Sequence, residues 1–176
     1  MAVAHVWDAF GAEPCGVNLP LEPGRRRILE QLCGASATPR TSSAGRLFDA
    51  VAALAGVCVE SSYEGEAAML LEAAAGGEAG EPYPYEIAGG VIDTRPLIGA
   101  VCRDLRAGAG AAAVSRRFHS ALAAMMESLC VELRERSGLE RVCLSGGTFQ
   151  NRLLETQARP LQQARGFAVY AHRVVP

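Results

Sequence analysis

The stretch CLSGGTFQN, residues 143–151, places two glycines between an apolar run and the start of a helical pattern. Glycines let a backbone approach a ligand closely, and a helix amino terminus offers unpaired N–H groups at the positive end of its dipole. The carboxamide of Asn151 offers both a donor and an acceptor, which suits a nucleoside base or a ribose. A tight strand-to-helix turn with a capping hydroxyl fits the same residues, so both interpretations remain open. The stretch is neither a P-loop nor a G-x-G-x-x-G turn.

Two further stretches carry acidic residues that could bind a polar ligand. Asp49 lies inside a helical pattern, where acidic residues hold ribose hydroxyls in some proteins but more often simply face water. The stretch Tyr63-Glu64-Gly65-Glu66 combines a glycine with carboxylates where a loop enters a helix. Its simpler interpretation is an ordinary helix start.

The apolar periodicity predicts the elements that must position these residues. Ser42 or Ser43 is expected to cap the helix that carries Asp49, and Ser61 or Ser62 to open the next helix. A hairpin turning at Gly89-Gly90 is expected within residues 78–92. The remaining expected helices span residues 1–11, 25–33, 95–105, 111–137 and 149–165, and the expected strands span residues 141–145 and 167–171. Residues 57–59 form a short apolar run.

The last of these elements follow the order strand, helix, strand, which defines a βαβ unit with parallel strands. Ser145, Gly146 and Gly147 then lie at the carboxyl end of the first strand, where open α/β sheets place their ligands. The sequence therefore predicts an α/β fold whose candidate site lies at this strand-to-helix turn.

Composition excludes several classes of function. The net charge is −2, so there is no basic footprint for nucleic acid or for an anionic membrane. The three histidines are well separated, which argues against a local zinc cluster. None of the six cysteines forms a C-x-x-C pair and most lie in apolar runs, so we expect reduced, unpaired and buried thiols in a cytoplasmic protein.

Five motifs occur in an order that resembles the carboxyl-terminal region of the HypF family, the hydrogenase-maturation carbamoyltransferases. They are TSSAGRLFDAVAALAGV, SYEGEAAMLLE, IDTRPLI, RFHSALA and LSGGTFQNRLL. The resemblance implies a helix-rich partial lobe of the actin-like ATPase and sugar-kinase fold, with a carboxyl-terminal βαβ unit. Residues 1–40 would be an amino-terminal helical segment of the same domain, and residues 41–176 the nucleotide-binding lobe.

The resemblance also assigns roles to the candidate residues. By this likeness Gly146 and Gly147 lie against the adenosine of ATP or carbamoyl-adenylate, and Asn151 hydrogen-bonds it. Asp49 would hold the ribose, with Gly65 and Glu66 in the loop beside it, so these residues should converge on one concave surface. No catalytic residue and no metal ligand are expected in this chain. The family's H-x-x-x-H motif is absent, and its Asp-Gly-Gly motif would follow the final Val-Val-Pro, so the divalent metal belongs to other parts of the enzyme.

The resemblance therefore implies a fragment of a HypF-type carbamoyltransferase that is inactive alone. Its expected partners are the missing lobe, the upstream domains and a HypE-type carbamoyl acceptor protein. Two alternatives remain open: a non-catalytic binding module derived from this fold, and an O-carbamoyltransferase of small-molecule biosynthesis.

Overall fold

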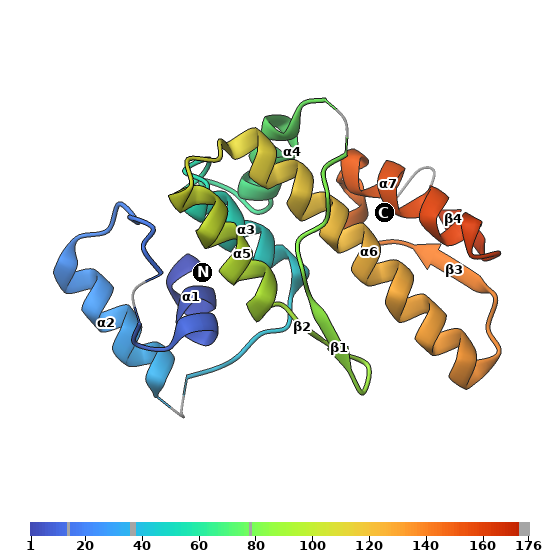
Figure 1. The fold of residues 1–176 in the computed structure, drawn as a ribbon, viewed down its shortest axis with the longest axis horizontal. Coiled ribbons are helices and arrows are strands. Elements are labelled where there is room, and N and C mark those ends of the chain that lie inside the picture. The colour runs from blue at the N-terminus through green and yellow to red at the C-terminus, as the bar shows by residue number, and fades with distance from the viewer. Residues whose placement is uncertain (14, 36–37, 78, 173–176) are drawn as a thin grey trace. The chain divides into compact units, whose positions relative to one another are not determined.

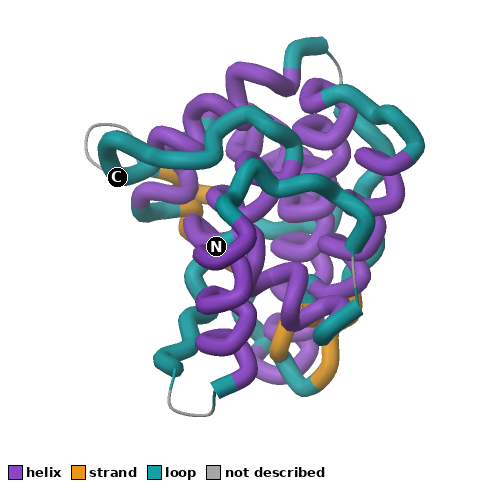
Figure 2. Tube along the Cα trace, turned by 90° about the vertical axis from the view of Figure 1, so that its left-hand side faces the viewer, coloured by secondary structure: helices purple, strands orange, loops and turns teal. Residues whose placement is uncertain are grey.

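The computed structural model describes residues 1–13, 15–35, 38–77 and 79–172. The final Val-Val-Pro, where the resemblance places the start of the missing family sequence, lies outside these residues. Helices form most of the described chain, and its strands form two short ladders (Figure 2). The chain divides into two compact units, Met1–Gly76 with Arg95–Ser115 and Gly77–Thr94 with Arg116–Pro176.

The first unit consists mainly of helices (Figure 1), and buried apolar side chains form its core. Helix α1 (Ala2–Phe10) packs against α2 (Pro23–Gly34), α3 (Ala44–Leu54) and α5 (Arg95–Arg106), and α3 also packs against α4 (Glu66–Ala75). The helices expected for residues 1–40 thus share a core with α3 and α5. The fully buried side chains of this core include Phe48, Val51, Leu71, Leu97, Ile98 and Val101.

The segment between α3 and α4 corrects one prediction. The short apolar run at residues 57–59 forms no strand, because Val57 and Cys58 donate their N–H groups to the Ala52 carbonyl at the end of α3. Helix α4 does not open at Ser61 or Ser62 but begins after Gly65, which takes a left-handed conformation with φ of 86°. The connection is therefore a folded loop bound to the end of α3.

The second unit contains both strand ladders. Strands β1 (Glu86–Ala88) and β2 (Val91–Asp93) pair antiparallel around Gly89-Gly90, which confirms the predicted hairpin. Strands β3 (Arg141–Leu144) and β4 (Ala168–Ala171) pair parallel, with Arg141 opposite Ala168. Helix α7 (Arg152–Ala164) connects them, so the predicted βαβ unit and its parallel strands are confirmed.

Helix α6 (Ala111–Ser137) has the predicted bounds, and most of its residues belong to the second unit. Phe118, Ala121 and Ala123 on it are completely buried. Gly138 follows with φ of 70°, a conformation that ends a helix readily when the residue is glycine. The long helical pattern therefore gave correct bounds because its apolar face and its terminating glycine agree.

The thiols follow the prediction only in part. All six cysteines are free, as expected, but Cys143 is exposed, and Cys33 and Cys130 are only half-buried. Cys143 lies on the face of β3 opposite its neighbour Leu144, and only Leu144 is buried. An apolar run therefore does not bury every residue in it, because the side chains of a strand alternate between faces.

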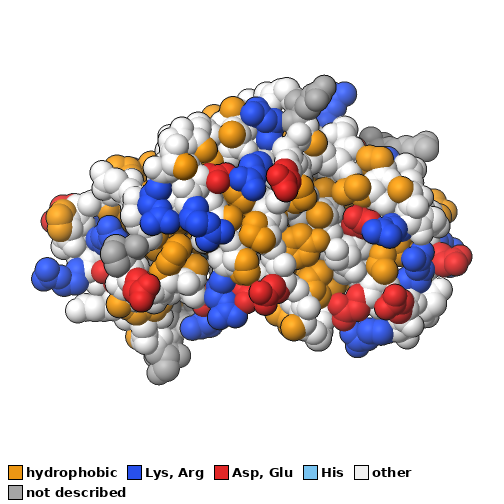
Figure 3. All heavy atoms as spheres, in the orientation of Figure 1, with side chains coloured by type: hydrophobic (Ala, Val, Ile, Leu, Met, Phe, Trp, Pro, Cys, Tyr) orange, Lys and Arg blue, Asp and Glu red, His pale blue; other side chains and the backbone are white. Residues whose placement is uncertain are grey.

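The surface carries both signs of charge with hydrophobic side chains between them (Figure 3). Ile28 and Leu32 on α2 are 59% and 50% exposed. Among the described residues, no helix combines the length and the apolar character required to cross a bilayer.

Candidate functional site

Asp49 lies on the polar side of an otherwise buried helix. The apolar residues of α3, among them Phe48 and Val51, face the core of the first unit. Asp49 shares the opposite side with Arg46, three residues earlier, and Arg46 Nη1 lies 2.8 Å from Asp49 Oδ2. The Asp49 side chain is 19% exposed, so the carboxylate is oriented by its ion pair and still reaches the surface.

Cys58 holds the loop that faces Asp49. Its thiol lies 3.4 Å from the Glu60 carbonyl and 3.6 Å from Ser61 Oγ, while its N–H bonds to the end of α3. Because Cys58 is buried, these contacts fix the path of the chain toward Tyr63 and Gly65. A small, weakly polar side chain is suited to this position.

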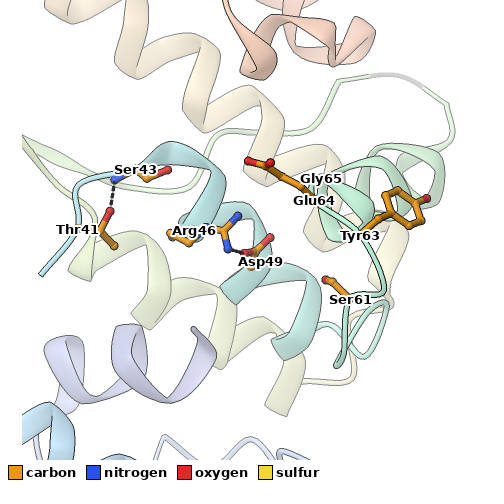
Figure 4. Close-up of a pocket in the computed structure, with 8 residues that line it drawn as sticks. All are labelled: Thr41, Ser43, Arg46, Asp49, Ser61, Tyr63, Glu64 and Gly65. Atoms are coloured by element: carbon orange, nitrogen blue, oxygen red, sulfur yellow. Dashed lines mark hydrogen bonds and ion pairs between the residues drawn. The ribbon is translucent and has the colours of Figure 1, made fainter. Parts of the chain in front are cut away.

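Together α3 and this loop line an open hollow of about 530 Å³. Figure 4 shows the side chains of Arg46 and Asp49 meeting between the Thr41–Ser43 segment and the loop that carries Ser61 and Tyr63. Tyr63 is 54% exposed, so an aromatic face is available there. The hollow thus combines a carboxylate, a guanidinium, hydroxyl groups and an aromatic ring, a set that suits a polar ligand with a flat ring system. Its lining residues are Thr41, Ser43, Arg46, Asp49, Ser61, Tyr63, Glu64 and Gly65.

Gly65 and Glu66 differ in their relation to the hollow. Gly65 lines it, and a Cβ placed on Gly65 would meet no atom within 4 Å, so the backbone is open there. Glu66, the first residue of α4, instead accepts a hydrogen bond from the Ser62 N–H through Oε2. Glu66 therefore shapes the loop and is not among the residues that line the hollow.

In the second unit, the glycine turn follows β3 directly. Gly146 has φ of 87° and ψ of 174°, and a short 3-10 helix, η1 (Gly147–Gln150), begins after it. A Cβ placed on either Gly146 or Gly147 would meet nothing within 4 Å. The backbone is consequently bare on this side of the turn, as close approach by a ligand requires.

Asn151 is buried, with 7% of its surface exposed. Its Oδ1 accepts a hydrogen bond from the Leu154 N–H at 2.8 Å, which caps α7. Its Nδ2 lies 2.9 Å from Nε2 of His119 on α6. The side chain of Asn151 therefore has partners within the chain at both ends of its carboxamide.

The structure brings the predicted residues together in two groups. Asp49 and Gly65 line one hollow in the first unit, whereas Gly146, Gly147 and Asn151 occupy one connection in the second. The convergence of the two groups joins residues of different units and stays a prediction. No set of three or more His, Cys, Asp or Glu side chains in the described ranges is arranged to hold a metal ion.

Comparison with known proteins defines the class of the chain. The model of a family described as "Carbamoyltransferase, Kae1-like Domain, second subdomain" matches residues 1–176. The crystal structure of full-length HypF in the phosphate- and nucleotide-bound form aligns with 99% of this chain at a TM-score of 0.89 and 32% identity. The fold is therefore that of a Kae1-like carbamoyltransferase subdomain, which confirms the predicted helix-rich α/β lobe.

The curated relatives identify the family. Carbamoyltransferase HypF of Rhodobacter capsulatus is 43% identical over 69% of this chain, and that of Synechocystis sp. is 34% identical over 100% of it. The chain belongs to the HypF carbamoyltransferases. It spans 16% and 25% of the lengths of these two relatives and 28% of the full-length HypF structure, so it corresponds to one part of those proteins.

Sequence reasoning missed three residues that shape the two groups. Arg46 was detectable, because opposite charges three residues apart on a helix commonly pair. His119 was visible only as part of the RFHSALA motif, and 32 residues separate it from its partner Asn151. Cys58 carried no signal beyond its apolar neighbours, since its thiol contacts depend on the fold of the loop.

Proposed function

We propose that this chain supplies the adenosine-binding part of a HypF-type carbamoyltransferase, with ATP or carbamoyl-adenylate as its ligand. One observation carries the proposal: in a chain of this family, the Asp49 carboxylate lines an open hollow beside a glycine whose backbone is bare. The nucleotide in the HypF structure that aligns with this chain gives independent support.

Asp49 suits the ribose end of such a ligand. A carboxylate has about four acceptor positions on its two oxygens, and the Arg46 ion pair occupies only part of Oδ2. The remaining positions are available to the two hydroxyl groups of a ribose. Arg46 fixes the direction of the carboxylate, which reduces the ordering cost of binding.

The glycine turn allows a ligand to approach the backbone closely. Gly146 and Gly147 leave no side chain between the backbone and a ligand, and the turn leads to the amino terminus of α7. Asn151 contributes by holding this terminus, and one N–H of its amide remains for a ligand if the other bonds His119. A Cβ added at Gly147 would enter the space that the ligand takes.

In the complete enzyme, ATP, carbamoyl phosphate and water yield carbamoyl-adenylate, and pyrophosphate and phosphate leave. A thiolate at the carboxyl terminus of a HypE-type acceptor then attacks the carbamoyl carbon, the bond from that carbon to the AMP phosphate oxygen breaks, and AMP leaves. The carbamoylated acceptor is used in the synthesis of the cyanide ligand of [NiFe]-hydrogenase. We expect the ligands of the family's divalent metal to come from other parts of the enzyme.

The proposal is tested in a chimera in which residues 1–176 replace the matching segment of the Synechocystis HypF. We expect the chimera to release AMP from ATP only with carbamoyl phosphate, and the isolated chain to bind nucleotides weakly without turnover. A few hydrogen bonds of about 0.5–1.5 kcal/mol each do not offset the several kcal/mol of freedom that the ligand loses. Carbamoyl-phosphate-dependent AMP release by the isolated chain would contradict the proposal.

Asp49→Ala in the chimera should abolish nucleotide binding while changing the free energy of unfolding by only about 0.5 kcal/mol, the value of an i,i+3 ion pair on a helix surface. Glu30→Ala is the matched control, since Glu30 pairs with Arg26 at 2.8 Å on α2 and does not line the hollow. It should leave ATP binding unchanged. Equal loss of binding in both variants would show that Asp49 has no specific role.

A further inference from the structure

His119 is a buried polar residue to which the proposed nucleotide site assigns no role. It lies on α6 with 0% of its surface exposed, and its Nε2 is 2.9 Å from Asn151 Nδ2. Burial of two hydrogen-bonding groups is costly unless each is paired, so this contact is a specific arrangement. It joins α6 to the first residue before α7.

The chemistry of the cap determines which atoms face each other. The Leu154 N–H is a donor, so the Asn151 atom that meets it at 2.8 Å must be the carbonyl oxygen. The NH₂ group of Asn151 therefore faces His119, and Nε2 must accept. An imidazole that accepts at Nε2 is neutral and carries its proton on Nδ1.

Further side-chain bonds join α6 to residues later in α7 or directly after it. Ser120 Oγ donates to Gln157 Oε1 at 3.0 Å, and Arg165 Nε pairs with Glu127 Oε1. These bonds hold α7 beyond its first turn. The His119 bond, by contrast, reaches Asn151, the residue that joins α7 to the glycine turn.

We propose that His119 is a positioning residue for the glycine turn: its neutral ring holds the Asn151 carboxamide, which holds the backbone of Gly146 and Gly147 where a nucleotide approaches. The proposal rests on the proposed function, because the value of the turn depends on its ligand. It also assigns a role to the histidine of the RFHSALA motif.

A first experiment reads the proton on the ring. In the full 176-residue chain, nitrogen-15 NMR of labelled histidine should show His119 with Nδ1 protonated and Nε2 unprotonated, with His5 and His172 assigned by substitution. Asn151→Asp keeps the cap but presents an oxygen to Nε2, so the proton should move to Nε2. A protonated Nε2 in the unsubstituted chain would overturn the proposal.

A second experiment measures ATP affinity by calorimetry in the Synechocystis chimera. His119→Gln places an amide oxygen near the position of Nε2, whereas His119→Asn is one methylene too short to reach Asn151. We expect the Gln variant to stay within about threefold of the unsubstituted chimera and the Asn variant to bind about tenfold more weakly, as loss of about 1.4 kcal/mol implies. Equal affinities in the two variants would overturn the proposal.

Ser120→Ala is the matched control, since it removes the neighbouring bond from α6 to Gln157 without touching Asn151. It should leave ATP affinity unchanged, and a loss equal to that of His119→Asn would show that any loosening of α7 is sufficient. If the unsubstituted chimera binds no ATP, the proposed function itself fails. If the chimera binds ATP with the same affinity in the His119 variants, only the positioning role is contradicted.

Discussion

The two groups of candidate residues use their side chains in opposite ways. Asp49 is partly exposed on α3 and pairs with an arginine on the same helix. Asn151 is buried, and its carboxamide bonds both the Leu154 N–H and the His119 ring. In the first group the side chain is available to a ligand, whereas in the second the glycine backbone is open and the Asn151 side chain caps the helix that follows. Substitution of these two side chains should therefore affect mainly binding at Asp49 and mainly stability at Asn151.

Asn151→Ala should have the largest effect on stability. It removes a helix cap worth about 1 kcal/mol and leaves the buried His119 nitrogen without this donor, at about 1–3 kcal/mol. We expect the free energy of unfolding to fall by about 2 kcal/mol or more, measured by urea denaturation of the 176-residue chain. A loss below about 0.5 kcal/mol would remove the distinction between the two groups.

Substitution of the two adjacent glycines should separate an effect on stability from an effect on ligand binding. Gly146 has φ of 87° and ψ of 174°, a region almost restricted to glycine, so Gly146→Ala should cost about 1–3 kcal/mol. Gly147 is not among the glycines with positive φ and has open space around it, so Gly147→Ala should change stability by less than about 0.5 kcal/mol. Urea denaturation measures both effects. In the chimera, Gly147→Ala should nevertheless weaken ATP binding, and normal binding would show that no ligand approaches there.

The reactivity of Cys102, in the buried core of the first unit, can be compared with that of Cys143, on the strand next to the glycine turn. Burial, together with the neighbouring Cys15, raises the pKa of Cys102 to about 12, so its thiolate is scarce near pH 8. Cys143 on β3 is exposed. With iodoacetamide and mass spectrometry, Cys143 should be labelled first and Cys102 only after unfolding, and Cys143→Ser should remove the fast phase. Early labelling of Cys102 would show that the core opens readily.

Much of the fold was predictable because local and long-range signals agreed. The βαβ unit, the hairpin at Gly89-Gly90 and the bounds of α6 all follow from periodicity and from glycines at the turns. The run at residues 57–59 gave no prediction of its structure, because three apolar residues cannot distinguish a strand from a loop. The N–H groups of Val57 and Cys58 found their acceptor at the end of α3 and not on another strand.

The candidate site was less accessible to sequence reasoning. The pattern of α3 placed Asp49 on a polar helix face, but the hollow itself depends on how Cys58 holds the following loop. The turn at Gly146 was recognisable from its residue types, whereas the bond from Asn151 to His119 joins positions 32 residues apart. Such contacts are set by the packing of α6 against α7, on which a single sequence carries no direct information.

The smallest expected effect concerns an exposed cap, the counterpart of the buried cap at Asn151. Glu22 caps α2 and accepts from the Arg25 N–H at 2.9 Å. Backbone hydrogen bonds from Gly24 and Arg25 lower the pKa of Glu22 below its ordinary value of 4.5. Because the pKa is lower in the folded state, the cap stabilises the chain above pH 4.5, and this contribution disappears as the pH falls through the folded value.

Carbon-13 NMR titration should place the Glu22 midpoint below 4.5. Glu22→Ala should reduce stability slightly at pH 7, much less than Asn151→Ala, and the difference from the unsubstituted chain should vanish in acid. Glu22→Gln, which keeps a neutral acceptor, should show a weaker pH dependence at the same position. A midpoint at or above 4.5 would show that the backbone hydrogen bonds do not stabilise the Glu22 carboxylate. A loss of stability as large as that of Asn151→Ala would contradict the view that burial is what makes the cap of α7 strong.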